Sequence, residues 1–119
     1  MSKAAMSLFI YSIYALALSL ILIIAPNVLL SLFGFPPTTE VWIRVAGILL
    51  LYLGLYDMQA ARTELTPFLK WSVVTRGSAI FIFTMFVLSG FARPALILFG
   101  VIDLSAALWT ALALRSSPS

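Results

Sequence analysis

Hydrophobic residues dominate four stretches of the chain, and short segments rich in polar residues, proline and glycine separate them. The first stretch carries no charged residue from Ala4 to Thr39. A helix that crosses a bilayer needs about 20 consecutive apolar residues, so this run is long enough to span one. The pattern predicts four apolar helices, over residues 6–33, 41–61, 67–89 and 94–114. The polar tail beyond them is expected to fray.

Turn signals mark the boundaries of these stretches. The segment GFPPTTE follows the first, Thr66-Pro67 reads as an N-cap and first helical position of the third, and GFARP precedes the fourth. Pro26 interrupts the first stretch and is expected to kink its helix. Either a neighbouring helix or the Asn27 amide would then satisfy the carbonyl that the proline frees.

Two of the turns resemble each other. The sequences LFGFP, from Leu32, and LSGFARP, from Leu88, each contain Gly-Phe followed by a proline. Both lie between an outgoing and a returning helix, so two hairpins of the same orientation would form a bundle with pseudo-two-fold symmetry. The shared motif is short, and chance explains it almost as well.

The composition indicates that the four apolar stretches lie in a membrane rather than in the buried core of a soluble protein. The 119 residues are 63% hydrophobic and 9% charged, whereas a soluble domain carries about 25% charged residues. The chain is too short for more than one domain. We therefore predict a single all-α domain, a bundle of four transmembrane helices with short loops, whose main partner is the lipid bilayer.

The polar inventory excludes several function classes. The chain has no cysteine and no histidine, which removes disulfides, thiolate chemistry and histidine-ligated zinc or haem. It contains no run of Lys or Arg to follow a phosphate backbone, so no nucleic acid is expected. No catalytic residue, metal site or cofactor is predicted, and enzymatic activity is the weakest hypothesis.

The net charge of +3 bears on orientation. Cytoplasmic segments of membrane proteins carry an excess of Lys and Arg. One predicted side holds Lys3, Arg62, Lys70 and Arg115, with Arg76 nearby, and the other holds Arg44 and Arg93. Both termini are therefore predicted to face the cytoplasm.

Charged residues inside the predicted spans need partners, because each costs about 2.5–3.5 kcal/mol at bilayer depth. Arg44 and Asp57 lie thirteen residues apart in one span, about 20 Å along a helix, and cannot pair with each other. We expect two interhelical pairs, Arg44 with Asp103 and Asp57 with Arg76, so the second span should contact both the third and the fourth. The pairs either fix helix packing or line a cavity for a polar headgroup, an ion or a proton. In a third interpretation, Arg44 or Asp57 extends to an interface.

Other faces of the second span suggest packing. Gly47 and Gly54 fall on one side of the helix, with Ala61 continuing the line, and small residues let another helix approach closely. Tyr52 and Tyr56 lie one turn apart and either line an apolar pocket or act as packing and interface aromatics. Asn27, beside Pro26, is interpreted as a partner for backbone groups rather than a ligand for a substrate.

The segments APNVLLSLFGFP, VWIRVAGILLLYLGLYDMQAAR, FLKWSVVTRG and FGVIDLSAALWTALALR together resemble small bacterial four-helix membrane proteins of the broad DoxX-like type. The shared motifs are Arg-x-x-Gly at Arg44, Arg-Gly at Arg76 and the aspartate at Asp103. The resemblance implies a multi-pass protein of the bacterial inner membrane. It rests on layout, so the redox association of DoxX is not carried over.

Two functions follow from these observations. The short loops leave almost no soluble domain, which favours a structural or accessory membrane subunit, as a homo-oligomer or with another membrane protein. The alternative is binding or transport of a small lipid-like or quinone-like molecule in a cavity of the bundle, with Arg44 and Asp103 at its polar end.

Overall fold

The computed structural model describes residues 1–116, which form helices and connections with no strand among them. The helices are α1 (Lys3–Ile24), α2 (Pro26–Leu32), α3 (Trp42–Arg62), α4 (Thr66–Leu88) and α5 (Leu96–Ser116). All except α2 are long and apolar enough to cross a membrane. The all-helical fold and the four apolar helices are confirmed. The polar tail is expected to fray from Arg115 onward, but Arg115 and Ser116 belong to α5. The rest of the tail lies outside the described residues.

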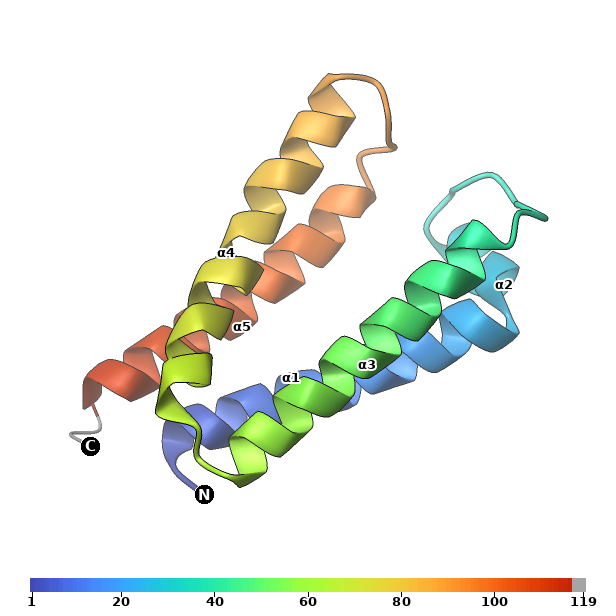
Figure 1. Ribbon diagram of the computed structural model, residues 1–119. Helices are drawn as coiled ribbons and strands as arrows, with labels where there is room; N and C mark the ends of the chain where they lie inside the picture. The colour runs from blue at the N-terminus through green and yellow to red at the C-terminus, as the bar shows by residue number, and fades with distance from the viewer. Residues whose placement is uncertain (117–119) are drawn as a thin grey trace.

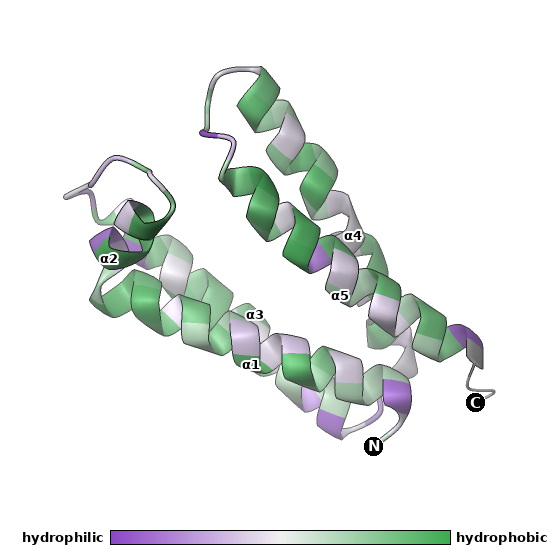
Figure 2. Cartoon of the chain, turned by 180° about the vertical axis from the view of Figure 1, so that it is seen from behind, coloured by the Kyte–Doolittle hydropathy of each residue, from purple (hydrophilic) through white to green (hydrophobic). Residues whose placement is uncertain are grey.

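The helices form two hairpins that meet at one end and diverge toward the other (Figure 1). In one hairpin α1 packs along α3, and in the other α4 packs along α5. The start of α1, the end of α5 and the α3–α4 connection lie at the joined end, where α1 against α5 provides most of the contact between hairpins. Apolar residues cover all four long helices, and hydrophilic positions gather mainly at helix ends (Figure 2).

α3 does contact α4, as expected, but only through a few residues, and the expected packing of α3 against α5 is not found in the described chain. α3 packs on α1 and barely touches α4. The reason lies in its glycines. A Cβ atom at Gly47 would stand 2.9 Å from Cβ of Leu22 and 3.2 Å from the backbone nitrogen of Ile23, and one at Gly54 would stand 3.0 Å from Cδ2 of Leu16. The small-residue face of α3 is therefore occupied by α1, and neither of the later helices can use it.

Pro26 breaks the first apolar stretch instead of kinking it. α1 stops at Ile24, and α2 is a separate helix of 7 residues. The guanidinium of Arg44 donates to the carbonyl oxygens of Ile23 and Ile24 at the end of α1. A neighbouring helix thus satisfies the last carbonyls of α1, although the carbonyl that Pro26 itself frees, that of Leu22, is not the one bound.

Asn27 has a different backbone partner from the one expected. Its side-chain amide donates to the carbonyl of Thr38 at 3.1 Å, and its side-chain oxygen accepts from the Thr38 N–H at 2.9 Å. The residue is exposed. It closes the connection between α2 and α3, and the carbonyls at the end of α1 do not depend on it.

The two similar turns in the sequence have the same backbone conformation. Gly34 and Gly90 have φ angles of +74° and +82°, in the left-handed region where glycine carries no steric cost. The following residue closes each helix end: Phe35 N–H donates to Leu30 O at 2.8 Å, and Phe91 N–H donates to Phe86 O at 2.9 Å. This bond pattern is the Schellman motif. The sequence echo therefore corresponds to one helix-ending turn used twice.

The buried core of small and aliphatic residues lies at the joined end of the hairpins. It consists of Ala4, Ala5, Leu8, Ala60, Ala61, Leu69 and Ala113. The α3–α4 connection is held to the start of α1 there, because the Ser2 backbone N–H donates to the Glu64 carboxylate. This hydrogen bond holds the pKa of Glu64 below its usual value. Tight packing at one end leaves the other end free to diverge.

Gly47→Ala is expected to destabilise the α1–α3 hairpin by about 1–3 kcal/mol, because the added methyl meets the α1 backbone. Gly77→Ala is the matched control: its Cβ would lie 3.8 Å from Ala107 Cβ, an ordinary contact, and alanine is the better helix former by about 1 kcal/mol. Unfolding in mixed micelles with increasing SDS measures both. Equal stability of the two variants would contradict the close α1–α3 contact.

Candidate functional site

A buried network of hydroxyl groups and one guanidinium joins three helices near the meeting point of the hairpins. Thr110 Oγ1 on α5 lies 2.6 Å from Ser7 Oγ on α1 and accepts from Arg76 Nη2 on α4 at 2.9 Å. The same Nη2 donates to Ser72 Oγ at 3.1 Å, and Arg76 Nε donates to Ser72 O at 3.2 Å. All four residues are buried. Thr110 is therefore the shared partner of α1 and α4.

Arg76 does not form the expected ion pair with Asp57. Within residues 1–116, no carboxylate lies within 4.0 Å of its guanidinium. The side chain instead turns toward Ser72 and Thr110, and its Cζ lies 4.8 Å from the ring centroid of Tyr11. Arg76 is only 5% exposed, and its Nη1 has no hydrogen-bond partner among the described residues. Asp57 and Arg76 nevertheless line the same cavity.

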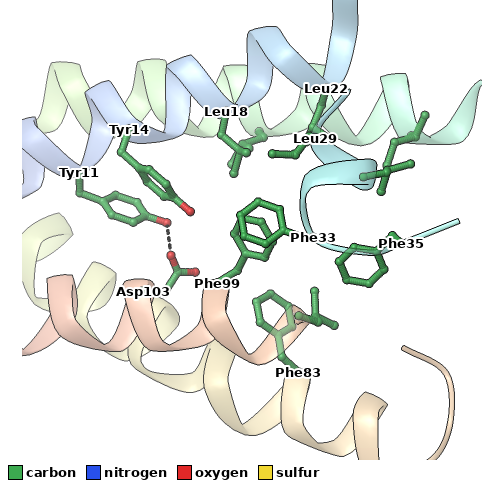
Figure 3. Close-up of a pocket in the computed structure, with 14 residues that line it drawn as sticks. Tyr11, Tyr14, Leu18, Leu22, Leu29, Phe33, Phe35, Phe83, Phe99 and Asp103 are labelled. Carbon is green, nitrogen blue, oxygen red and sulfur yellow. Dashed lines mark hydrogen bonds between the residues drawn. The ribbon is translucent and has the colours of Figure 1, made fainter. Parts of the chain in front are cut away.

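Asp103 does not pair with Arg44. The Tyr11 hydroxyl on α1 donates to Asp103 Oδ1 at 3.0 Å (Figure 3). Arg44 lies near the diverging end of the hairpins and binds the end of α1. The predicted pair assumed that α3 and α5 run side by side over their whole length. Their divergence removes that contact, and a tyrosine from α1 takes the place of the arginine.

An apolar cavity of about 330 Å³ lies between the two hairpins, and we call it the inter-hairpin cavity (Figure 3). Leucine, isoleucine and aromatic side chains from all five helices line it, and Asp103 is its one charged residue within the described part of the chain. Its aromatic rings belong to Tyr11, Tyr14, Phe33, Phe35, Phe83 and Phe99. The rings of Phe33 and Phe99, with centroids 4.9 Å apart, connect the end of α2 to α5.

A second cavity, of about 500 Å³, lies between α3 and α4, and we call it the α3–α4 cavity. It holds Asp57 and Arg76 and shares Tyr11, Leu50 and Asp103 with the inter-hairpin cavity. The Tyr11–Asp103 hydrogen bond therefore lies where the inter-hairpin cavity meets a cavity that carries two further charged side chains. This arrangement suits an amphipathic molecule whose polar group reaches Asp103.

The predicted pocket residues Tyr52 and Tyr56 line neither cavity. They are 52% and 65% exposed on the outside of α3, and the interpretation of this pair as pocket aromatics is wrong. The tyrosines of the cavity, Tyr11 and Tyr14, come from α1, where the sequence reasoning missed them. The signal was present, because Ser7, Tyr11, Tyr14 and Leu18 recur at helical spacing on one face.

The serines of the apolar helices mostly bond to their own helix. Ser12, Ser19 and Ser78 donate to carbonyls three residues earlier, as expected for hydroxyls in apolar helices. No three potential metal ligands of the Asp and Glu type lie together within residues 1–116. The chemistry on offer is therefore hydrogen bonding and charge at Tyr11, Asp103 and Arg76.

Comparisons of the chain with protein-family models, with curated proteins and with solved structures give no match. The resemblance to DoxX-like proteins stays a prediction, and the functional argument rests on geometry.

Thr110→Val is expected to destabilise the fold by about 1–2 kcal/mol, since it removes the hydroxyl that joins Ser7 and Arg76 and leaves one buried N–H of Arg76 without its partner. Thr84→Val is the matched control, because Thr84 is half-buried on α4 and outside this network. SDS titration of both variants measures the difference. If Thr110→Val and Thr84→Val unfold at the same SDS fraction, the network does not hold the hairpins together.

Proposed function

We propose that the chain is an integral membrane protein that crosses the bilayer four times with both termini in the cytoplasm. Apolar residues cover the four long helices, and the start of α1 and the end of α5 lie at one end of the molecule (Figures 1 and 2). The basic residues at that end are Lys3, Arg62, Lys70 and Arg115, which matches the excess expected of a cytoplasmic side. Together with the DoxX-like resemblance, this favours a bacterial inner membrane.

We infer that the protein binds a small lipid-like or quinone-like molecule in the inter-hairpin cavity. The observation that carries this proposal is the Asp103 carboxylate, which lies in an otherwise apolar cavity lined by all five helices. Ligand sites typically enclose about 300–1,000 Å³, with mostly apolar walls and few polar groups. A cavity of about 330 Å³ with Tyr14 and Asp103 as polar groups fits this description.

The arrangement of the hairpins supports entry from the bilayer. The hairpins diverge at the end opposite the start of the chain (Figure 1), and the inter-hairpin cavity is lined by side chains of both hairpins. An apolar body can lie among the aromatic and leucine side chains while its polar group reaches Asp103. A ligand dissolved in lipid would therefore reach the site without crossing water.

A second candidate function is that of a structural or accessory subunit. The α3–α4 connection has only residues 63–65, and few residues lie outside the helices. Any protein partner would therefore meet the helices within the membrane. Tyr52, Tyr56 and Trp71 are more than half exposed on α3 and α4 and are available to a neighbouring helix or to a second copy.

For orientation, a C-terminal fusion to green fluorescent protein is expected to fluoresce in bacterial cells, and a C-terminal alkaline phosphatase fusion is expected to be inactive. Both outcomes follow from the basic residues at the joined end. Active phosphatase with a dark fluorescent fusion would place the termini outside and overturn the proposed orientation.

For binding, Leu18→Trp is expected to fill the inter-hairpin cavity and weaken ligand affinity about tenfold, or about 1.4 kcal/mol. Leu49→Trp is the matched control, because Leu49 is 58% exposed and outside the cavity. The probe is a decyl-substituted benzoquinone added to the full chain in micelles, and native mass spectrometry counts the retained molecules. Equal retention by both variants would contradict binding in this cavity and favour the accessory function.

A further inference from the structure

The charged groups around the Tyr11–Asp103 bond do not balance. Asp57, Arg76 and Asp103 face the two joined cavities, so two carboxyl groups share one guanidinium. Arg44, the arginine in the first turn of α3, is bound to the end of α1 and lines neither cavity. Within the described chain, one of the two carboxyl groups at the junction has no basic side chain of its own to pair with.

The Asp103 carboxylate also has unused hydrogen-bonding capacity. Oδ1 accepts from Tyr11, and Oδ2 has no hydrogen-bond partner among residues 1–116. Oδ2 is not fully enclosed by protein atoms, in contrast to Arg76 Nη1, the one buried side-chain atom without a partner in the described chain. It therefore faces open cavity space rather than packed protein (Figure 3). A carboxylate in an apolar site is stabilised most by a positively charged partner.

The walls of the inter-hairpin cavity favour the same sign of charge. Tyr14, Phe33, Phe83 and Phe99 surround the space next to Asp103 (Figure 3). The faces of aromatic rings carry negative potential and attract cations, ligand cations included. A neutral molecule would leave the carboxylate uncompensated, and an anion would be repelled by it. A cation alone gains from both the carboxylate and the rings.

We propose that the inter-hairpin cavity binds a lipophilic organic monocation, with its charged centre beside Asp103 and its apolar groups among the aromatic rings. This proposal rests on the proposed binding function and names the class of its ligand. The bilayer supplies such molecules to the opening between the hairpins, since a cation with large apolar groups partitions into lipid.

Tetraphenylphosphonium and tetraphenylborate test the proposal, because they share shape and apolar surface and differ in the sign of their charge. Equilibrium dialysis of each ion against the full chain in micelles measures binding, with protein-free micelles as the baseline for partition. We expect saturable binding of the cation, about tenfold tighter than that of the anion. Equal binding of the two ions, or cation uptake no greater than in empty micelles, would overturn the proposal.

Asp103→Asn is expected to weaken tetraphenylphosphonium binding about tenfold, because it removes the charge while its amide oxygen can still accept from Tyr11. Glu40→Gln is the control, since it removes an exposed acid that lines neither cavity. Phe99→Leu, which keeps the carboxylate and removes one ring, is expected to weaken binding severalfold and covers the case of a misfolded Asp103→Asn. Unchanged affinity in both Asp103→Asn and Phe99→Leu would place the cation elsewhere.

The decyl-substituted benzoquinone separates this proposal from the one on which it rests. Displacement of the quinone by tetraphenylphosphonium, lost in Asp103→Asn, supports both. Saturable quinone binding that the cation does not disturb leaves the proposed function standing and overturns the cation site. If neither probe binds and only bilayer phospholipid is retained, both proposals are wrong.

Discussion

The Thr110 hydroxyl group is the constraint on which the rest of the arrangement depends. It is fully buried and meets Ser7 of α1 and Arg76 of α4 from its place on α5. In an apolar environment a polar group without a partner is costly, so these three helices must stay together at this level. This buried network holds the hairpins together at their joined end, and the Tyr11–Asp103 and Phe33–Phe99 contacts connect them across the inter-hairpin cavity.

α1 has the central role because its faces serve different purposes. One side lies against the glycines of α3, with Ala15 and Leu16 near Gly54, and this contact depends on close approach. The other side presents Ser7 and Tyr11 to α5 through hydrogen bonds. Dispersion fixes the first contact and polar pairing fixes the second. The mainly apolar helix α1 can thus pack closely on α3 with one side and line the inter-hairpin cavity with the other.

The sequence is sufficient to predict the long helices but not which helices and side chains contact each other. Run length and turn residues predict the long helices, and the Gly-Phe echo corresponds to the shared turn at Gly34 and Gly90. The predicted ion pairs are wrong because depth along each helix was converted into contact as though the helices were parallel. Depth says nothing about divergence, which removes Arg44 from Asp103. The predicted pairs also give Arg76 only a carboxylate as partner, whereas the hydroxyl groups of Ser72 and Thr110 bind it in place of Asp57.

Arg76 belongs to both the scaffold and the site. Its Nη2 donates to Ser72 and Thr110, which holds the hairpins together, and its charge offsets part of the negative charge of Asp57 and Asp103. A substitution at Arg76 would therefore change stability and binding at once. Asp103 differs, since its single hydrogen bond within residues 1–116 comes from Tyr11 and its second oxygen faces the cavity. A substitution at Asp103 can therefore change ligand binding without breaking the contacts that hold the hairpins together, whereas a substitution at Arg76 cannot.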